Sequence, residues 1–185
     1  MPHGIAIVGL NGSGKTTLGR ALAEALGYFR IDVEDYYFPA EGAFDKPRSR
    51  DEVERLMLAD IEKHGDFVLS AVCADFASIE KYYDLVVYLE APKDIRMERI
   101  RQRSVDRFGD RVLPGGDLYE NEEKFFAFAA KRTPEKVEKW IADLTCRVIR
   151  LDSEKSVAQL VADTQKILEI HQTNLHKTLD KRQTT

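Results

Sequence analysis

The stretch GLNGSGKTT, at residues 9–17, matches the spacing G-x-x-x-x-G-K-[ST] of a loop that binds nucleotide phosphates. The glycines of such a loop let backbone amides turn toward phosphate oxygens, and the helix that follows adds partial positive charge at its N-terminus. The Lys15 ammonium would reach the β- and γ-phosphates, and the Thr16 hydroxyl can bind Mg²⁺. We therefore predict an ATP and Mg²⁺ site formed by Gly9, Asn11, Gly12, Ser13, Gly14, Lys15, Thr16 and Thr17.

Three carboxylates follow in RIDVEDYYF, at residues 30–38: Asp32, Glu34 and Asp35. Asp32 ends a short apolar run that reads as a strand. A carboxylate at a strand end can hold Mg²⁺ through water, and another can accept the proton of an attacking hydroxyl. We predict Asp32 and Thr16 as the metal-binding pair. The competing interpretation gives these side chains ordinary roles, with Glu34 on the surface and Asp35 as a helix cap.

Five arginines recur at helical spacing: Arg96, Arg99, Arg103, Arg107 and Arg111. Like charges four residues apart on a helix repel each other, so a row of them is favoured beside a polyphosphate. Neighbouring acidic residues offer the alternative, a solvated helix with short-range ion pairs. Phe108-Gly109 interrupts the row, and residues 114–116 read Pro-Gly-Gly, which is suited to a hinge. The pattern favours a mobile lid at about residues 103–117.

Short apolar runs alternate with amphipathic stretches along the chain. The runs that read as strands are residues 5–8, 28–31, 67–72, 85–89 and 147–151. The stretches that read as helices are residues 17–26, 51–63, 92–107, 120–132, 134–144 and 156–170. Strands separated by helices must run parallel, and continuous Val/Ile/Leu runs are typical of strands covered on both faces. The sequence therefore predicts a three-layer α/β fold.

Capping signals mark three helix starts. Ser49 and Asp117 each precede a glutamate by three residues, which is the spacing of a capping box, and Thr133 precedes a proline suited to a first helical turn. Helices are therefore expected to begin at these positions.

Composition limits the possible functions. The 185 residues are 43% hydrophobic and carry a formal net charge of −4, a balance typical of one globular domain and unfavourable for coating nucleic acid. No apolar run approaches the roughly 20 residues of a membrane span. The N-terminus lacks the features of a signal peptide, so we expect a cytoplasmic protein with no membrane partner. Cys73 and Cys146 are expected to be reduced core residues.

The phosphate loop, the RIDVEDYY stretch, DLVVYLEAPKDIRMERIRQR and the arginines beyond it resemble the small P-loop kinases over roughly residues 4–170. These include nucleoside monophosphate, shikimate, gluconate and uridine kinases. The resemblance implies a P-loop NTPase fold with five parallel strands in the order 2-3-1-4-5, and a lid insert. It also implies that lid arginines contact ATP, a role that we assign to Arg103 and Arg107. Asp32-Val33-Glu34 is similar to the Asp-x-Asp of shikimate kinases. Asp35-Tyr36-Tyr37 is similar to the Asp-x-Phe-Tyr of uridine kinases, whose aspartate is the base.

The predicted function is a phosphotransferase that uses ATP and Mg²⁺ to phosphorylate a small-molecule acceptor, with Lys15, Asp35, Arg103 and Arg107 as catalytic residues. One domain would span residues 1–170, with the acceptor region at about residues 33–55 and a polar tail at residues 171–185. A regulatory nucleotide-binding ATPase is the alternative. A GTPase is disfavoured because no N-K-x-D motif is present, and a kinase of nucleic-acid ends is disfavoured by the acidic charge. Arg48, Arg50 and Arg55 flank the acceptor loop and could pair with an acidic acceptor. The sequence leaves the acceptor, the choice of base among the three carboxylates and the oligomeric state open.

Overall fold

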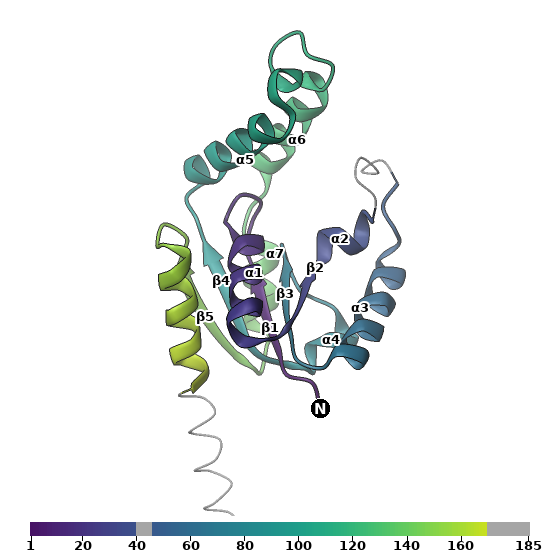
Figure 1. Ribbon diagram of the computed structural model, residues 1–185, viewed down its shortest axis with the longest axis vertical. Coiled ribbons are helices and arrows are strands. Elements are labelled where there is room, and N and C mark those ends of the chain that lie inside the picture. The colour runs from purple at the N-terminus through teal and green to yellow at the C-terminus, as the bar shows by residue number, and fades with distance from the viewer. Residues whose placement is uncertain (40–45, 170–185) are drawn as a thin grey trace, which may run out of the picture.

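The computed structural model describes residues 1–39 and 46–169, in which five parallel strands form one sheet (Figure 1). The strands are β1 (Gly4–Val8), β2 (Phe29–Asp32), β3 (Phe67–Ala71), β4 (Tyr83–Glu90) and β5 (Arg147–Asp152). Their order is β2-β3-β1-β4-β5, with β1 at the centre between β3 and β4. The predicted parallel sheet and its strand order are confirmed.

Helices connect the strands. They are α1 (Lys15–Leu26), α2 (Val33–Tyr37), α3 (Arg50–His64), α4 (Ala77–Glu80), α5 (Lys93–Phe108), the 3₁₀ helix η1 (Gly109–Val112), α6 (Tyr119–Lys131) and α7 (Glu135–Ala142). A last helix covers residues 157–169. The predicted tail at 171–185 and part of the predicted acceptor loop lie outside the described residues.

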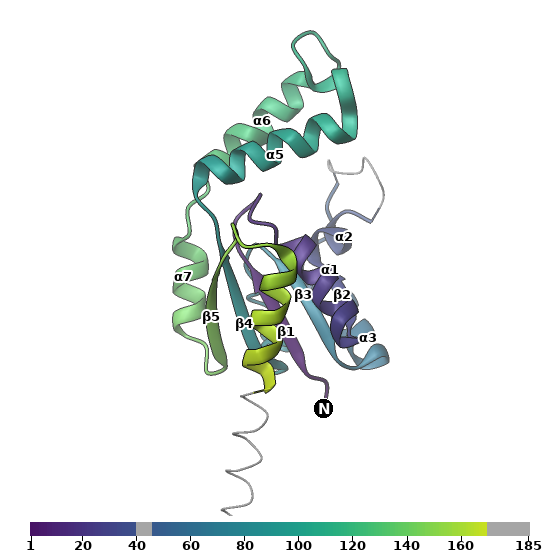
Figure 2. The ribbon, with the colours of Figure 1, turned by 60° about the vertical axis from the view of Figure 1, so that its left-hand side comes forward.

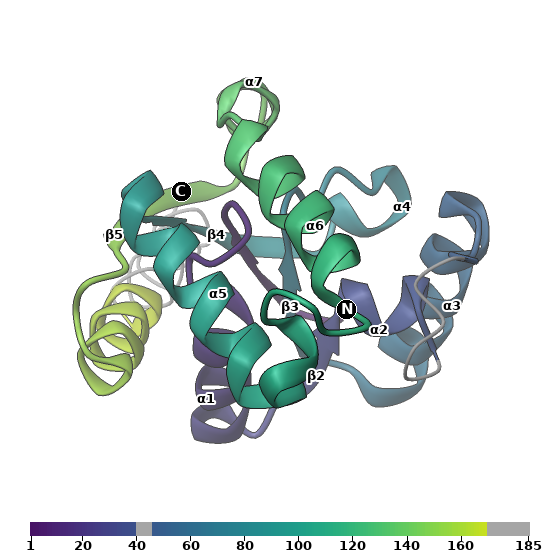
Figure 3. The ribbon, with the colours of Figure 1, turned by 90° about the horizontal axis from the view of Figure 1, so that it is seen from above.

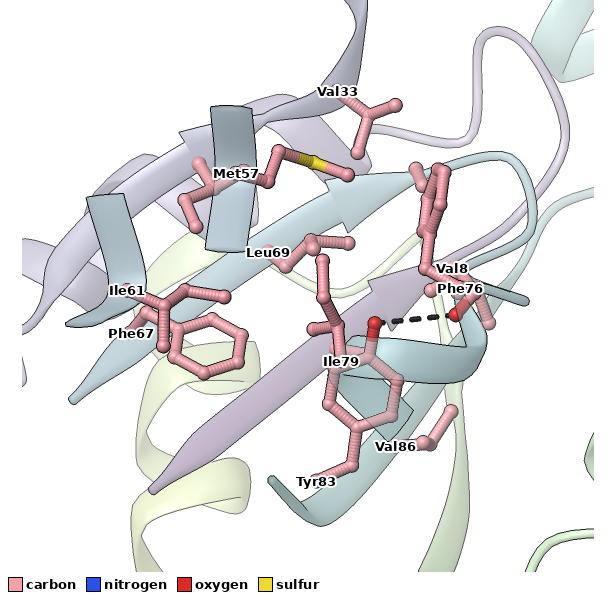
Figure 4. Close-up of a cluster of buried hydrophobic side chains, with 14 of the residues drawn as sticks. Val8, Val33, Met57, Ile61, Phe67, Leu69, Phe76, Ile79, Tyr83 and Val86 are labelled. Carbon is pink, nitrogen blue, oxygen red and sulfur yellow. Dashed lines mark hydrogen bonds between the residues drawn. The ribbon is translucent and has the colours of Figure 1, made fainter. Parts of the chain in front are cut away.

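The sheet is buried on both faces, because successive side chains of each strand point to opposite sides. On one face Val53, Met57 and Ile61 of α3 pack with Ile79 of α4 and Val137 of α7 against the strands. Figure 4 shows the α3 and α4 part of this core. On the other face α1 and the last helix pack through Leu18, Leu22 and Leu160. Three layers result, as predicted.

Helices α5 and α6 extend beyond the carboxyl ends of the strands as an arm, residues 93–131 (Figure 2). They lie side by side and share a small core of their own: Met97, Ile100, Phe126 and Ala129. From above, the arm crosses over the loop between β1 and α1 (Figure 3). The arm therefore lies where the carboxyl ends of parallel strands commonly form ligand sites.

The capping predictions were partly right. The Ser49 hydroxyl accepts a hydrogen bond from the Glu52 amide at 3.3 Å, so α3 begins as expected. No side-chain cap precedes α6 or α7. The Asp117 carboxylate instead accepts two hydrogen bonds from Arg111, at 2.9 and 2.7 Å, and it is therefore not available as a cap.

The remaining predictions about the chain's organisation concern the helix break, the cysteines and membrane spans. Helix α5 ends at Phe108, followed by Gly109 with a left-handed φ of 59°, which confirms the predicted break. Cys73 and Cys146 are free and half-buried, just outside β3 and β5. Within residues 1–39 and 46–169, no helix combines the length and apolar character that crossing a membrane requires.

Candidate active site

The phosphate loop, residues 9–17, joins the end of β1 to the start of α1, which is the structural context that its motif requires. Gly14 is the N-cap residue of α1 and has a φ of 95°. Gly12 has a φ of 83°, and a Cβ atom there would lie 2.4 Å from the carbonyl oxygen of Arg96. Only glycine fits at Gly12, since both the backbone conformation and the close approach of α5 exclude a side chain. Residues of α5 therefore form a wall of the phosphate loop.

Lys15 is buried, with 7% of its surface exposed. Burial lowers the pKa of its ammonium group, the carboxylates of Glu34 and Asp32 raise it, and the guanidinium groups of Arg103 and Arg132 lower it further. The net direction is downward. The side chain thus lies within electrostatic reach of four charged groups from three segments: the junction of β2 with α2, helix α5, and the residue after α6. This convergence identifies the phosphate loop as one end of a site that extends toward β2 and the arm.

The predicted metal-binding residues lie at the junctions of β1 with α1 and of β2 with α2, and β3 separates the two strands in the sheet. Thr16 is exposed in the first turn of α1. Asp32 is buried at the carboxyl end of β2, where it pairs in register with Ser70 of β3. Its carboxylate accepts a hydrogen bond from the Glu34 amide at 3.2 Å and caps α2. The hydroxyl and carboxylate oxygens are of the kind that Mg²⁺ binds, so these residues fit the ion chemically.

The two other carboxylates have different surroundings. Asp35 lines the cleft, but its side chain is 66% exposed and lies 3.1 Å from the Arg30 guanidinium. Glu34 also lines the cleft, and its charge acts on both Lys15 and Arg132. The charge of Glu34 therefore acts on Lys15 of the phosphate loop, whereas the charge of Asp35 is paired with Arg30.

The arginine row divides into two groups, and the first two members bind the backbone of the phosphate loop. Arg96 is buried and donates to the Asn11 carbonyl oxygen at 3.1 Å. Arg99 donates to the Ser13 carbonyl oxygen at 3.4 Å and to the hydroxyl and carbonyl oxygens of Ser153, at 3.2 and 3.0 Å. These two arginines hold the arm to the phosphate loop and to the loop after β5.

Arg103, Arg107 and Arg111 line the cleft farther along the arm. The positive charge of Arg103 lowers the pKa of Lys15, whereas Arg111 forms an ion pair with Asp117 at 2.7 Å. Arg103 therefore has the most direct electrostatic relation to the phosphate loop among the three.

Arg132 was missed from the sequence. It follows α6, its guanidinium lies 4.6 Å from the centre of the Phe128 ring, and it donates to Asn11 Oδ1 at 3.2 Å. Burial lowers its pKa, and Glu34 raises it. Arg132 is outside the four-residue periodicity of the other arginines, and its only sequence signal is a basic pair before Thr133-Pro134. Both ends of the arm thus contact Asn11, through Arg96 and Arg132.

One cleft of about 1950 Å³ is lined by Asn11 of the phosphate loop, by Glu34 and Asp35, and by Arg103, Arg107, Arg111 and Arg132, whereas Lys15, Thr16, Asp32, Arg96 and Arg99 are not among its lining residues. It passes the segment that begins with α2 and reaches the loop after β3 and the start of α7. Among the buried side-chain atoms that the structure describes, Ser13 Oγ and Arg96 Nε lack a hydrogen-bond partner. Neither residue lines the cleft itself, because Ser13 belongs to the phosphate loop and Arg96 to its wall, where a bound phosphate would supply hydrogen-bond acceptors.

Comparison with known proteins concerns the family and the fold of the chain. The sequence profile described as an AAA domain matches residues 5–124. The chain is 36% identical over 170 residues to "Uncharacterized protein YqaC" of Bacillus subtilis (strain 168), covering 87% of this chain and 94% of that one. It is also 30% identical over 156 residues to a "Putative adenylate kinase" of Thermococcus kodakarensis (strain ATCC BAA-918 / JCM 12380 / KOD1), covering 79% of this chain and 87% of that one.

Solved structures share the fold. A gluconokinase from Sinorhizobium meliloti 1021 superposes with a TM-score of 0.54 at 19% sequence identity, covering 96% of this chain and 97% of that one. The predicted resemblance to small P-loop kinases is confirmed, while similarity at this identity concerns the fold alone.

Proposed function

We propose that this chain, which belongs to the AAA domain family of P-loop proteins, is a kinase that transfers the γ-phosphoryl group of ATP to a small-molecule acceptor. Its relatives include proteins named as small-molecule kinases. The observation that carries the proposal is the convergence on Lys15 of the charges of two carboxylates and two guanidinium groups, three of which line a cleft that continues well beyond the phosphate loop. A site for ATP hydrolysis alone has no need of the additional length.

Phosphoryl transfer depends mainly on positioning and on stabilising the charge of the transferred group. Lys15 would bind the β- and γ-phosphates. Arg103, Arg107 and Arg132, around the same cleft, would bind the equatorial oxygens as their charge develops. Arg96 and Arg99 would act indirectly, by holding the loop and the arm in register.

Thr16 and Asp32 would hold Mg²⁺, Asp32 through water. The ion would supply charge neutralisation at the β- and γ-phosphate oxygens. Asp32 is suited to this position because its place at the end of β2 is fixed by the strand register and by its cap to α2.

A carboxylate would accept the proton of an acceptor hydroxyl. Asp35, the candidate from the sequence, would have to leave Arg30 to do so. Glu34 is the second candidate, favoured by its electrostatic relation to Lys15 and Arg132. If the acceptor group is itself a phosphate, neither carboxylate is needed as a base.

The experiment is an ADP-release assay with Mg-ATP and a panel of nucleosides, nucleotides, sugars and hydroxy acids. The proposal predicts that at least one class stimulates ADP release well above hydrolysis in buffer, with stoichiometric phosphorylated product detected by mass spectrometry. The Lys15→Ala variant, purified in the same way, controls for contaminating kinases. Hydrolysis that no acceptor stimulates would favour the alternative, a regulatory nucleotide-binding ATPase.

A further inference from the structure

The cleft is basic although the chain as a whole is acidic. The described residues that line it include seven basic and four acidic side chains, whereas the full sequence has a formal net charge of −4. The basic residues are Arg50, Arg103, Arg107, Arg111, Lys131, Arg132 and Lys136. A cleft with an excess of one charge sign concentrates ligands of the opposite sign. ATP phosphates account for Arg103 and Arg132, whose charges act on Lys15, but Arg50 and Lys136 lie on α3 and α7 and form a separate cluster.

Arg50 and Lys136 meet at a single carboxylate. Arg50 is the first residue of α3, Lys136 is in the first turn of α7, and Asp75 lies in the loop after β3. Asp75 Oδ1 is 3.3 Å from Arg50 Nη2, and Asp75 Oδ2 is 2.9 Å from Lys136 Nζ. Arg50 also donates to the main-chain carbonyl of Asp75. Two cations therefore share one anion, and Arg50, Asp75 and Lys136 together carry one net positive charge, with the carboxylate of Glu54 acting on Arg50 from the next turn of α3.

Asp75 is held in its charged form. Burial alone would raise its pKa, but the hydrogen bond from Lys136 and the charge of Arg50 outweigh burial and lower the pKa. Both oxygens of Asp75 have a cationic partner, so this carboxylate fixes the positions of Arg50 and Lys136.

Unused donors remain in the cluster. A guanidinium has five N–H groups and an ammonium has three. Within the part of the chain that the structure describes, Arg50 contacts Asp75 through Nη2, which leaves its Nε and Nη1 groups for a ligand. Lys136 uses one donor on Asp75. Donors without acceptors, on a cluster of net positive charge, favour a ligand group with several negative oxygens.

The surroundings orient this cluster. The Arg50 guanidinium lies 4.6 Å from the centre of the Phe76 ring, and this contact limits its rotation. Tyr37 and Val137 line the same cleft and provide apolar surface. A ligand with an anionic group at one end and a compact carbon skeleton fits such a surface.

We infer that the phosphoryl acceptor is an acid whose carboxylate or phosphate group binds Arg50 and Lys136. The inference rests on the proposed kinase function, since it names the substrate class of the same cleft. Asp75 is then a positioning residue that holds the two cations before the acceptor arrives. The acceptor's reactive oxygen lies toward Glu34 and Lys15, at the other end of its skeleton.

The test compares acceptors in matched pairs that differ in the acidic group: a nucleoside 5′-monophosphate and its nucleoside, gluconate and sorbitol, shikimate and its methyl ester. We expect kcat/KM to be at least about tenfold higher for the acid of the productive pair. The first pair reports recognition of a phosphate, and the other two report recognition of a carboxylate. A neutral partner with an equal kcat/KM would overturn the inference and leave the kinase proposal intact.

Substitutions of Arg50 and Lys136 test whether these two side chains bind the acidic group. Arg50→Gln and Lys136→Gln should each raise the KM for the acid by about tenfold, because each removes one charged hydrogen-bond donor from the acidic group of the acceptor. Their effect on kcat should be smaller, and Arg50→Lys should restore part of the affinity. The matched controls are Lys63→Gln on α3 and Lys139→Gln on α7, exposed residues that are not part of the cleft lining, which should leave the KM unchanged. Equal KM values for Arg50→Gln and Lys63→Gln would overturn the assignment.

A binding measurement separates this inference from the kinase proposal. Calorimetric titration of the wild-type protein and of Arg50→Gln with the same acids does not require turnover. If no acceptor stimulates ADP release, the kinase proposal fails, and acid binding that depends on Arg50 would identify an acid-sensing site. If no acid binds to the wild-type protein, the inference fails even if phosphoryl transfer to a neutral acceptor is found.

Discussion

The two ends of the cleft are built in different ways. At the nucleotide end, the phosphate loop is one continuous segment, and Arg96, Arg99 and Arg132 donate to its backbone or to Asn11. At the proposed acceptor end, the cluster of Arg50, Asp75 and Lys136 is assembled from three elements far apart in the sequence.

This difference corresponds to two tasks: binding the nucleotide, which is the same in every kinase of this kind, and binding the acceptor, which varies. Backbone conformation and buried guanidinium contacts determine the nucleotide end, so changes there disturb the loop itself. The acceptor end consists of side chains on helix starts, with Arg50 44% and Lys136 68% exposed. Such side chains can change without altering the fold, which is consistent with one architecture serving many acceptors.

The largest effect should come from Lys15→Ala. We expect kcat for phosphoryl transfer to fall by about 10³-fold or more, because the ammonium follows the γ-phosphoryl charge into the transition state. Burial lowers the pKa of Lys15, so the charged side chain is costly to bury, and its removal should leave the melting temperature unchanged or higher. Steady-state kinetics and thermal denaturation measure both. Near-full activity would refute the catalytic role of the phosphate loop, and a lowered melting temperature would refute the electrostatic argument.

The comparison also explains what could be predicted from the sequence. Strands were predicted within about two residues, because runs such as Ile5–Val8 are apolar on both faces of a covered sheet. Helices α2 and α4 were missed, since helices of 5 and 4 residues are too short to show a period. The phosphate loop was found because its chemistry is local. Arg132, Asp75 and Lys136 were not assigned to the site because tertiary structure alone brings them to the cleft.

The next effect concerns the arm. Arg103→Gln and Arg107→Gln should each lower kcat by about 10²-fold while changing the KM for ATP much less, since clamping is strongest as charge develops. We also expect residues 103–117 to become protected from proteolysis by an ATP analogue. Arg101→Gln is the matched control, because Arg101 lies on the same helix and is not part of the cleft lining. Equal cleavage with and without the analogue would count against a lid.

Glu34→Gln and Asp35→Asn distinguish the two candidate bases. Loss of a general base should reduce acceptor-dependent kcat by about 10²-fold, with ATP binding nearly unchanged. The electrostatic relation of Glu34 to Lys15 favours Glu34, whereas the sequence motif favours Asp35. The ratio of the two kcat values decides between them. If both variants retain kcat and change acceptor KM instead, the acceptor group is a phosphate and needs no base.

A smaller effect is expected at Asn11, where both ends of the arm meet. Asn11→Ala removes the acceptor of the 3.2 Å hydrogen bond from Arg132 and leaves the main-chain contact with Arg96. We expect kcat to fall by about tenfold, as for loss of one hydrogen bond to a charged group. Asn11→Asp keeps an acceptor for Arg132 but places a negative charge beside the phosphates, so it should raise the KM for ATP more than it lowers kcat. An Asn11→Ala enzyme with wild-type kinetics would show that this contact does not position Arg132.

The smallest effect should come from Tyr36→Phe, a change in stability at the acceptor end. The Tyr36 hydroxyl donates to Asp60 Oδ2 at 2.6 Å and joins α2 to α3, so its removal should cost about 1.5 kcal/mol of unfolding free energy. Burial and this hydrogen bond raise the pKa of Tyr36 above its ordinary value of about 10. Because the folded pKa is the higher one, the stabilisation should be complete below about pH 10 and should decline at higher pH, as the unfolded chain ionises first. Urea denaturation of the wild type and the variant at pH 8 and pH 10.5 measures the difference. A gap that widens between these two pH values would contradict the assignment of Tyr36 as the donor.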